Sequence, residues 1–132
     1  MITGCAIARL HHLSYIPQQY REAANVTDRL ENRIKFFNAG QYFEAHEAWE
    51  DLWRQTGGPL RLYYQGLIQT AVGLHHLERG NLTGARAQLG KALQKLEQYP
   101  EAFCRIDNLA LIAEIQSALQ DLTPRSILIL RK

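Results

Sequence analysis

A histidine and a glutamate four residues apart are the side chains in this sequence best suited to chemistry. They lie in the segment His46-Glu47-Ala48-Trp49-Glu50-Asp51-Leu52-Trp53. On an α-helix, His46 and Glu50 are one turn apart along the axis and about 40° apart in projection. Because burying an unpaired polar group is costly, each must have a partner if it is buried. We expect burial here, since their side of the helix also carries Tyr42, Phe43, Ala45, Trp49 and Trp53.

The next predicted helix offers polar partners for this pair. Gln65, Gln69 and His76 fall, with Val72, within a stripe about 60° wide, and His75 lies about 80° to one side. If the two helices form an antiparallel hairpin, some of these groups face the histidine and the glutamate. The spacing alone does not decide whether His75 or His76 points inward.

Three interpretations of this polar group stay open. In the first, His46, Glu50 and one of His75 and His76 bind a divalent metal, because two histidines and a carboxylate form many zinc and non-haem iron sites. In the second, the first two residues form an acid–base pair at a small-molecule pocket, and a glutamine of the next helix orients the ligand. In the third, the groups only satisfy one another and fix the packing of the hairpin.

The local pattern does not assign an enzymatic reaction. The string is His-Glu-x-x-Glu, whereas the metalloprotease helix requires His-Glu-x-x-His. Glu47 projects about 100° from His46, towards solvent, so it is poorly placed to act as a base beside a metal. Whether the chain is an enzyme therefore stays open.

Glycine and proline residues divide the chain into the helices that must position these groups. Gly40 is a natural left-handed terminator, and Asn81 and Asp107 are good helix caps. The predicted helices span about 18–39, 41–55, 59–79, 82–98 and 108–122, followed by an apolar tail at Ser126–Leu130. The first helix starts either after Pro17 or near Thr27, a second candidate cap. No segment elsewhere alternates like a strand. The sequence predicts an all-α, single-domain fold over residues 1–132, an array of about five helices built around an antiparallel helical hairpin.

Composition excludes several classes of protein. A formal charge of +2 with dispersed Lys and Arg argues against a nucleic-acid or membrane-surface partner. Leu62–Leu77 lacks charge but is short for a membrane span and contains glutamines and histidines, so it is expected to be a buried central helix. Cys5 and Cys104 have no paired spacing, and residues 1–10 do not resemble a secretory signal. We expect a cytoplasmic protein with free thiols.

The residues near the turn between the second and third predicted helices can be explained either by structure or by function. Arg54 and Arg61 flank Gly57-Gly58-Pro59, where they could receive an anionic ligand or lie at solvated helix ends. Trp49 and Trp53 are expected as core anchors, although Trp53 could also form the wall of a pocket beside Glu50.

One stretch resembles the defining segment of a prokaryotic family called domain of unknown function 309: Phe37-Asn38-x-Gly40-x-Tyr42-Phe43-Glu44-x-His46-Glu47-x-Trp49-Glu50-x-x-Trp53. Tyr64-Gln65-Gly66-Leu67-Ile68-Gln69, His75, Arg79-Gly80-Asn81 and Gly84-Ala85 extend the resemblance over about residues 30–115. It implies a small helical fold and a His-x-x-x-Glu-x-x-Trp motif at His46, Glu50 and Trp53, for which metal binding has been suggested. It also favours His75 over His76 as the inward histidine, and it carries over no activity.

We therefore expect a helical protein of uncharacterised role whose polar site binds a divalent metal through His46, Glu50 and His75. The residues expected to orient these ligands or a small molecule are Gln65, Gln69, Trp53 and His76. The alternative is a protein-interaction or homo-oligomeric module in which the polar motif is purely structural and the Ser126–Leu130 tail supplies an apolar interface.

Overall fold

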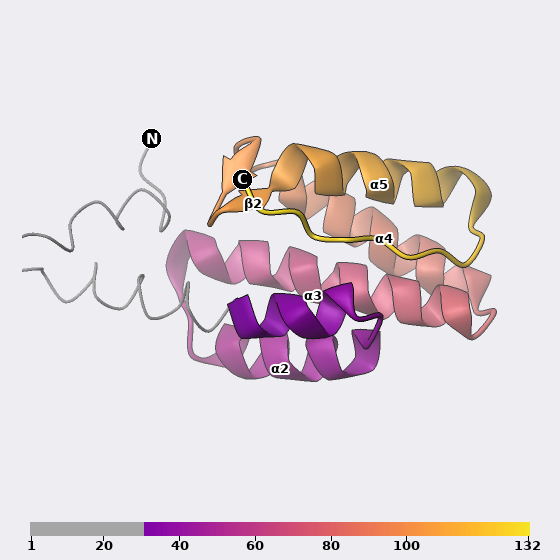
Figure 1. Ribbon diagram of the computed structural model, residues 1–132, viewed down its shortest axis with the longest axis horizontal. Coiled ribbons are helices and arrows are strands. Elements are labelled where there is room, and N and C mark those ends of the chain that lie inside the picture. The colour runs from indigo at the N-terminus through magenta and orange to yellow at the C-terminus, as the bar shows by residue number, and fades with distance from the viewer. Residues whose placement is uncertain (1–30) are drawn as a thin grey trace, which may run out of the picture.

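The computed structural model describes residues 31–132, and helices make up most of them (Figure 1). Residues 31–38 are helical and are followed by α2 (Tyr42–Arg54), α3 (Gly58–Glu78), α4 (Leu82–Leu96) and α5 (Asn108–Asp121). The prediction of an all-α fold is confirmed. The part of the first predicted helix before residue 31 lies outside the described residues.

The predicted start and stop signals act as expected. Gly40 has a φ of 78° and ends the first helical segment, a conformation that costs a glycine little. The side chains of Asn81 and Asp107 each accept a hydrogen bond of 3.0 Å from the backbone N–H three residues later. These bonds satisfy donors that the first helical turn leaves without a partner, so α4 and α5 begin where the sequence predicts.

Helix α3 lies between α2 and α4 and contributes most to the core. It is antiparallel to α2, because Phe43 near the start of α2 contacts His75 near the end of α3, and Trp53 near the end of α2 contacts Arg61 near the start of α3. The predicted hairpin is therefore present. The largest fully buried side chains include Phe37, Trp49, Leu52, Tyr63, Tyr64, Leu67, Leu74, Leu77, Leu89 and Leu96.

The link between α4 and α5 contains a small antiparallel hairpin that the sequence analysis missed. Strand β1 (Ala102–Phe103) pairs with β2 (Ile106–Asp107). The turn residues Cys104 and Arg105 have φ values of 51° and 60°, in the left-handed region, although neither is glycine or asparagine. The expectation that no strand occurs is wrong at this point.

Residues 122–132 form an extended segment that returns along α5 to the hairpin (Figure 1). Arg131 forms an isolated antiparallel bridge with Ile106 of β2. In the predicted apolar tail, Ile127 and Ile129 are buried and belong to the core, whereas Leu128 and Leu130 are exposed. No helix within residues 31–132 has the length and apolar character needed to cross a membrane.

Candidate functional site

The His46–Glu50 pair is formed in the structure. His46 Nε2 lies 3.2 Å from Glu50 Oε2, one turn along α2, as the four-residue spacing requires. Either the ring nitrogen donates its proton to the carboxylate, or a protonated ring forms an ion pair with it. The pair therefore places an imidazole nitrogen and a carboxylate oxygen at a single point on the helix surface.

The pair lies at the edge of the buried stripe of α2 and not in its middle. The buried residues of this helix are Tyr42, Ala45, Trp49 and Leu52. The stripe is therefore centred between Ala45 and Trp49, and His46 and Glu50 lie to one side of it. The side chains of the pair are 23% and 36% exposed. The expectation of full burial is wrong, and the partial exposure leaves the site open to a ligand.

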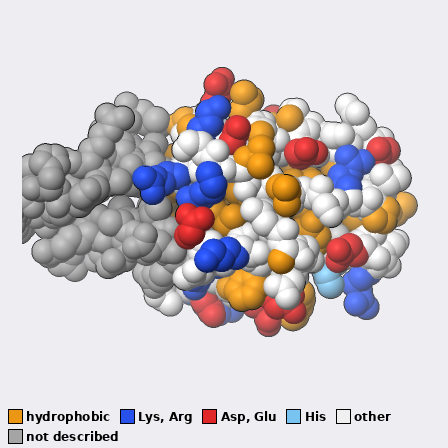
Figure 2. All heavy atoms as spheres, in the orientation of Figure 1, with side chains coloured by type: hydrophobic (Ala, Val, Ile, Leu, Met, Phe, Trp, Pro, Cys, Tyr) orange, Lys and Arg blue, Asp and Glu red, His pale blue; other side chains and the backbone are white. Residues whose placement is uncertain are grey.

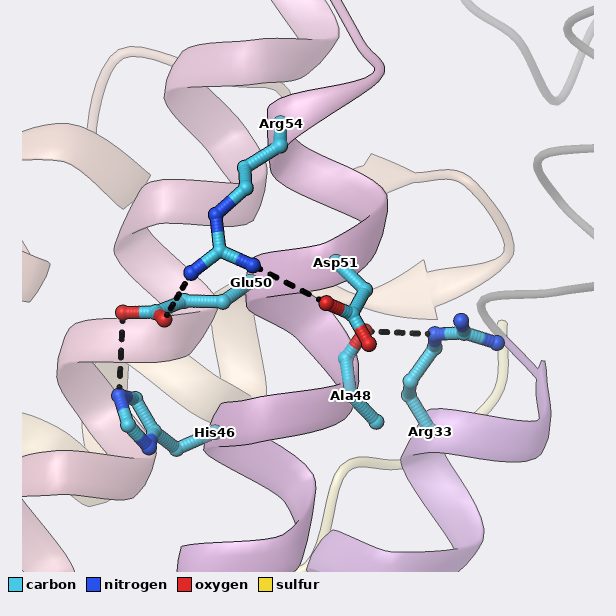
Figure 3. Close-up of polar contacts among 6 residues, drawn as sticks. All are labelled: Arg33, His46, Ala48, Glu50, Asp51 and Arg54. Carbon is cyan, nitrogen blue, oxygen red and sulfur yellow. Dashed lines mark hydrogen bonds and ion pairs between the residues drawn. The ribbon is translucent and has the colours of Figure 1, made fainter.

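Arg54 extends the pair by another helical turn. Its guanidinium donates to Glu50 Oε1 at 3.2 Å and to Asp51 Oδ1 at 3.1 Å, so Glu50 is held from both sides (Figure 3). Arg33 of the preceding helix donates to the Ala48 carbonyl at 3.0 Å and so links that helix to α2. Fixing one carboxylate oxygen orients the other one towards the imidazole.

Phe43 brings His75 to the same end of the hairpin. The Phe43 ring centroid lies 5.9 Å from that of His46 and 5.8 Å from that of His75. The neighbouring His76 instead points to the α3–α4 turn, where its Nδ1 lies 3.3 Å from the Asn81 amide nitrogen. The geometry thus agrees with the family resemblance in placing His75 on the side of α2.

The predicted orienting residues are less directly connected to the pair. Among residues 31–132, no hydrogen bond links Gln65 or Gln69 to His46 or Glu50. The Gln69 Oε1 and Trp53 Nε1 atoms are buried and have no hydrogen-bond partner within this range. Trp49 is fully buried as expected, and Trp53 is partly buried and packs against the core.

Arg54 and Arg61, which flank the turn between α2 and α3, already have partners. Arg61 places its guanidinium carbon 3.9 Å from the Trp53 ring centroid and donates to the Trp53 and Thr56 carbonyls at 3.4 and 3.2 Å. Such stacking places a cation over the negative face of an indole. Arg54 is engaged by its two carboxylates. Arg61 therefore braces the end of the hairpin, whereas the contacts of Arg54 lie within α2.

The fit of a metal ion to these residues is partial. Within the described part of the chain, no group of three or more His, Cys, Asp or Glu side chains is placed to hold an ion. The chemistry of the donors is nonetheless right for a transition metal, and two of them already meet at 3.2 Å. His75 could serve as a third ligand only after its ring moves from its place against Phe43.

A family model described as "Domain of unknown function (DUF309)" matches residues 30–88. The resemblance is confirmed. The match contains His46, Glu50, Trp53 and His75, and it ends within α4, short of the residue 115 expected from the sequence.

Two uncharacterised proteins are similar to this chain. YpuF of Bacillus subtilis is 34% identical over 65 residues, which cover 48% of this chain and 37% of YpuF. A protein of Aquifex aeolicus is 28% identical over 86 residues, which cover 64% of this chain and 25% of that protein. The chain thus matches well under half of the length of either relative, and neither name states an activity.

Two contributors to the site were missed by the sequence analysis. The role of Arg54 is visible in retrospect, because His46, Glu50 and Arg54 repeat every four residues and so line one face of a helix. Phe43 was expected to be buried, yet 47% of its surface is exposed. Its contact with His75 depends on how α3 crosses α2, which no local pattern reports.

Proposed function

We propose that the protein binds a divalent transition metal ion at the edge of the α2–α3 hairpin, with His46 and Glu50 as ligands. The observation that carries this proposal is the 3.2 Å approach of His46 Nε2 to Glu50 Oε2 in two side chains that remain partly exposed. A borderline nitrogen donor and a hard oxygen donor together suit Zn²⁺ and similar ions. Such an ion would supply Lewis acidity at this point.

His75 is the proposed third ligand. It is the histidine of α3 that faces α2, and Phe43 is the side chain in contact with both imidazoles. Arg54 would hold the outer carboxylate oxygen, and Gln69, whose Oε1 atom lacks a partner among the described residues, would be available to orient a bound water or ligand.

Calorimetric titration of chelator-treated protein with Zn²⁺ tests this proposal. His11 and His12 are replaced by alanine in every sample, so that these adjacent histidines add no binding. We expect one ion per chain, and we expect His46→Ala and Glu50→Gln each to weaken binding by at least about tenfold. His76→Ala is the matched control, because this neighbour of His75 faces Asn81, and it should leave binding unchanged. Binding that is unaffected by His46→Ala would reject the proposal.

A second candidate function is supported by the mutual pairing of the polar side chains on α2. Asp51, Arg54, Glu50 and His46 satisfy one another without any ligand, as a purely structural motif would. The protein would then be an interaction or homo-oligomeric module, and the half-exposed Phe43 would lie on its contact surface. On this alternative, Zn²⁺ does not bind and Phe43→Ala weakens self-association, measured by sedimentation.

The proposal places the protein in the cytoplasm and assigns it no nucleic-acid partner. The Cys104 thiol is free and buried, which suits a reducing compartment, whereas Cys5 lies outside the described residues. The small formal charge of +2 gives no electrostatic basis for binding nucleic acid.

A further inference from the structure

The extended segment 125–132 occupies its place in the fold as a bound peptide would. Its alternate residues point to opposite sides: Ile127 and Ile129 are 1% and 2% exposed, whereas Leu128 and Leu130 are 51% and 48% exposed. This is the alternation of a strand with one face in a groove. Figure 2, in the orientation of Figure 1, shows hydrophobic side chains reaching this face of the molecule between charged ones.

Three residues of one stretch of the chain bind three alternate residues of this segment. The Asn38 amide donates to the Ile129 carbonyl at 3.1 Å and accepts from the Ile129 N–H at 2.8 Å. The Tyr42 hydroxyl is hydrogen-bonded to the backbone of Ile127. Glu31 forms an ion pair of 2.7 Å with Arg131.

The Asn38 contact is the most informative of the three. A side-chain amide that pairs with both the N–H and the C=O of a single residue recognises the backbone of an extended chain. Such recognition does not depend on the side chains of the bound segment. The opposite edge of the segment pairs with the β-hairpin, where the Asp107 N–H donates to the Leu130 carbonyl at 2.8 Å and the Lys132 N–H donates to the Arg105 carbonyl at 2.9 Å. The groove therefore binds the segment by strand addition on one side and by an amide clamp on the other.

The connection between α5 and this segment is strained in the closed chain. Leu122 has a φ of 51°, in the left-handed region that disfavours a branched side chain. Thr123 and Pro124 after it are exposed. Arg125 is bound to Asp121 and Ser117 of α5, so the docked segment begins at Arg125. Residues 122–124 thus form a short hinge that must reverse the chain at a conformational cost.

We propose that this groove is an interaction surface for the same segment of a second copy, so that two chains exchange residues 125–132. A second copy is the occupant because it carries, by identity, the buried isoleucines, the backbone edge and the Arg131 that the groove already binds. Exchange would keep all of these contacts and release the left-handed turn at Leu122. This inference does not depend on the metal site, which lies on α2 and α3.

A charge reversal distinguishes exchange from closure within one chain. In Glu31→Arg and in Arg131→Glu, residues 31 and 131 of the same chain carry like charges. In an exchanged dimer of one copy of each, residue 31 of either chain meets an opposite charge at residue 131 of the other. We expect mixed dimers, measured by native mass spectrometry at low salt after joint refolding, to exceed those of either variant alone by about tenfold. No excess of mixed dimers would overturn the proposal.

Hinge variants give an independent measurement. Deletion of Thr123 and Pro124 leaves too little chain to reverse direction, so the variant should be dimeric at concentrations where the full chain is monomeric. Leu122→Gly removes the strain and should lower the dimer fraction below that of the unchanged chain. A deletion variant that folds and remains monomeric would contradict the proposal; if it does not fold, the charge-reversal mixture decides.

Discussion

The ring of Phe43 in α2 lies 5.8 Å from the ring of His75 in α3 and 5.9 Å from that of His46, so one aromatic side chain contacts both imidazoles. Phe43 therefore fills space next to each of the two proposed histidine ligands. It is also the most exposed aromatic residue of α2.

Phe43→Ala should therefore separate the two proposed functions. We expect tighter Zn²⁺ binding, because His75 gains room to move towards His46. The stability cost should be about 1 kcal/mol, since only about half of the Phe43 side chain is buried. Calorimetric titration and urea unfolding measure the two effects. Loss of Zn²⁺ binding in this variant would show that Phe43 holds the ligands in place and does not keep them apart.

The His46–Glu50 pair should contribute little to stability by itself. Because both side chains are partly exposed, we expect a coupling energy of about 0.2–1 kcal/mol between His46→Ala and Glu50→Ala. Urea unfolding of the two single variants and the double variant measures this quantity. A coupling of several kcal/mol would mean that the pair is shielded from solvent, contrary to its exposure in the structure.

The sequence predicted the features that depend on residues close to one another along the chain. Helix boundaries at Gly40, Asn81 and Asp107 followed from local chemistry, because caps and left-handed terminators act within a few residues. The four-residue spacing likewise placed His46 next to Glu50.

Features that depend on contacts distant in sequence were not predicted. The buried stripe of α2 is set by the helices that pack on it. The sequence therefore predicted Phe43 to be buried, whereas about half of its surface is exposed. The β-hairpin has no glycine or asparagine at Cys104 and Arg105, and it is held instead by Asn108 and by the returning segment. The Asn38–Ile129 contact joins residues 91 positions apart, beyond any local pattern.

Asn108 should be the polar residue whose loss costs the most stability. It is fully buried, its amide donates to the Leu96 and Pro100 carbonyls, and its Oδ1 accepts from the Tyr63 hydroxyl. Asn108→Ala leaves these groups without that partner, and we expect a loss of about 3 kcal/mol. Tyr63→Phe removes one of these bonds and should cost about 1 kcal/mol. Thermal unfolding of the two variants would reveal equal losses if the network did not act as described.

The close packing of α3 on α4 predicts opposite effects at two glycines. A Cβ added at Gly73 would lie 2.6 Å from side-chain atoms of Leu89 and 3.3 Å from its backbone nitrogen. We therefore expect Gly73→Ala to cost about 2–3 kcal/mol through overpacking. Gly90 lies within α4 with nothing within 4 Å of an added Cβ, so Gly90→Ala should stabilise the fold by about 0.5–1 kcal/mol. Similar unfolding midpoints for the two variants would argue against this helix contact.

Alkaline pH should weaken the fold through Tyr42. Burial raises the pKa of the Tyr42 hydroxyl above its usual value of 10.0, the hydrogen bond with the Ile127 backbone opposes this shift, and the nearby Glu78 charge adds to it. Between the unfolded and folded pKa values, the unfolded chain has lost a proton that the folded chain keeps. Stability contributed by this group is therefore fully present below about pH 10 and falls as the pH rises through the folded pKa.

Tyr42→Phe isolates this contribution. Burial and the neighbouring Lys91 lower the pKa of Lys95, so Lys95 acts in the opposite sense and makes the fold more stable as the pH rises towards its usual value of 10.5. The difference between wild type and Tyr42→Phe removes this background, since Lys95 is present in both. We expect the free energy of unfolding, measured in urea from pH 8 to pH 11, to fall less steeply above about pH 10 in the variant. Parallel curves would mean that Tyr42 titrates alike in the folded and unfolded chains, and its hydroxyl would then not be buried against Ile127.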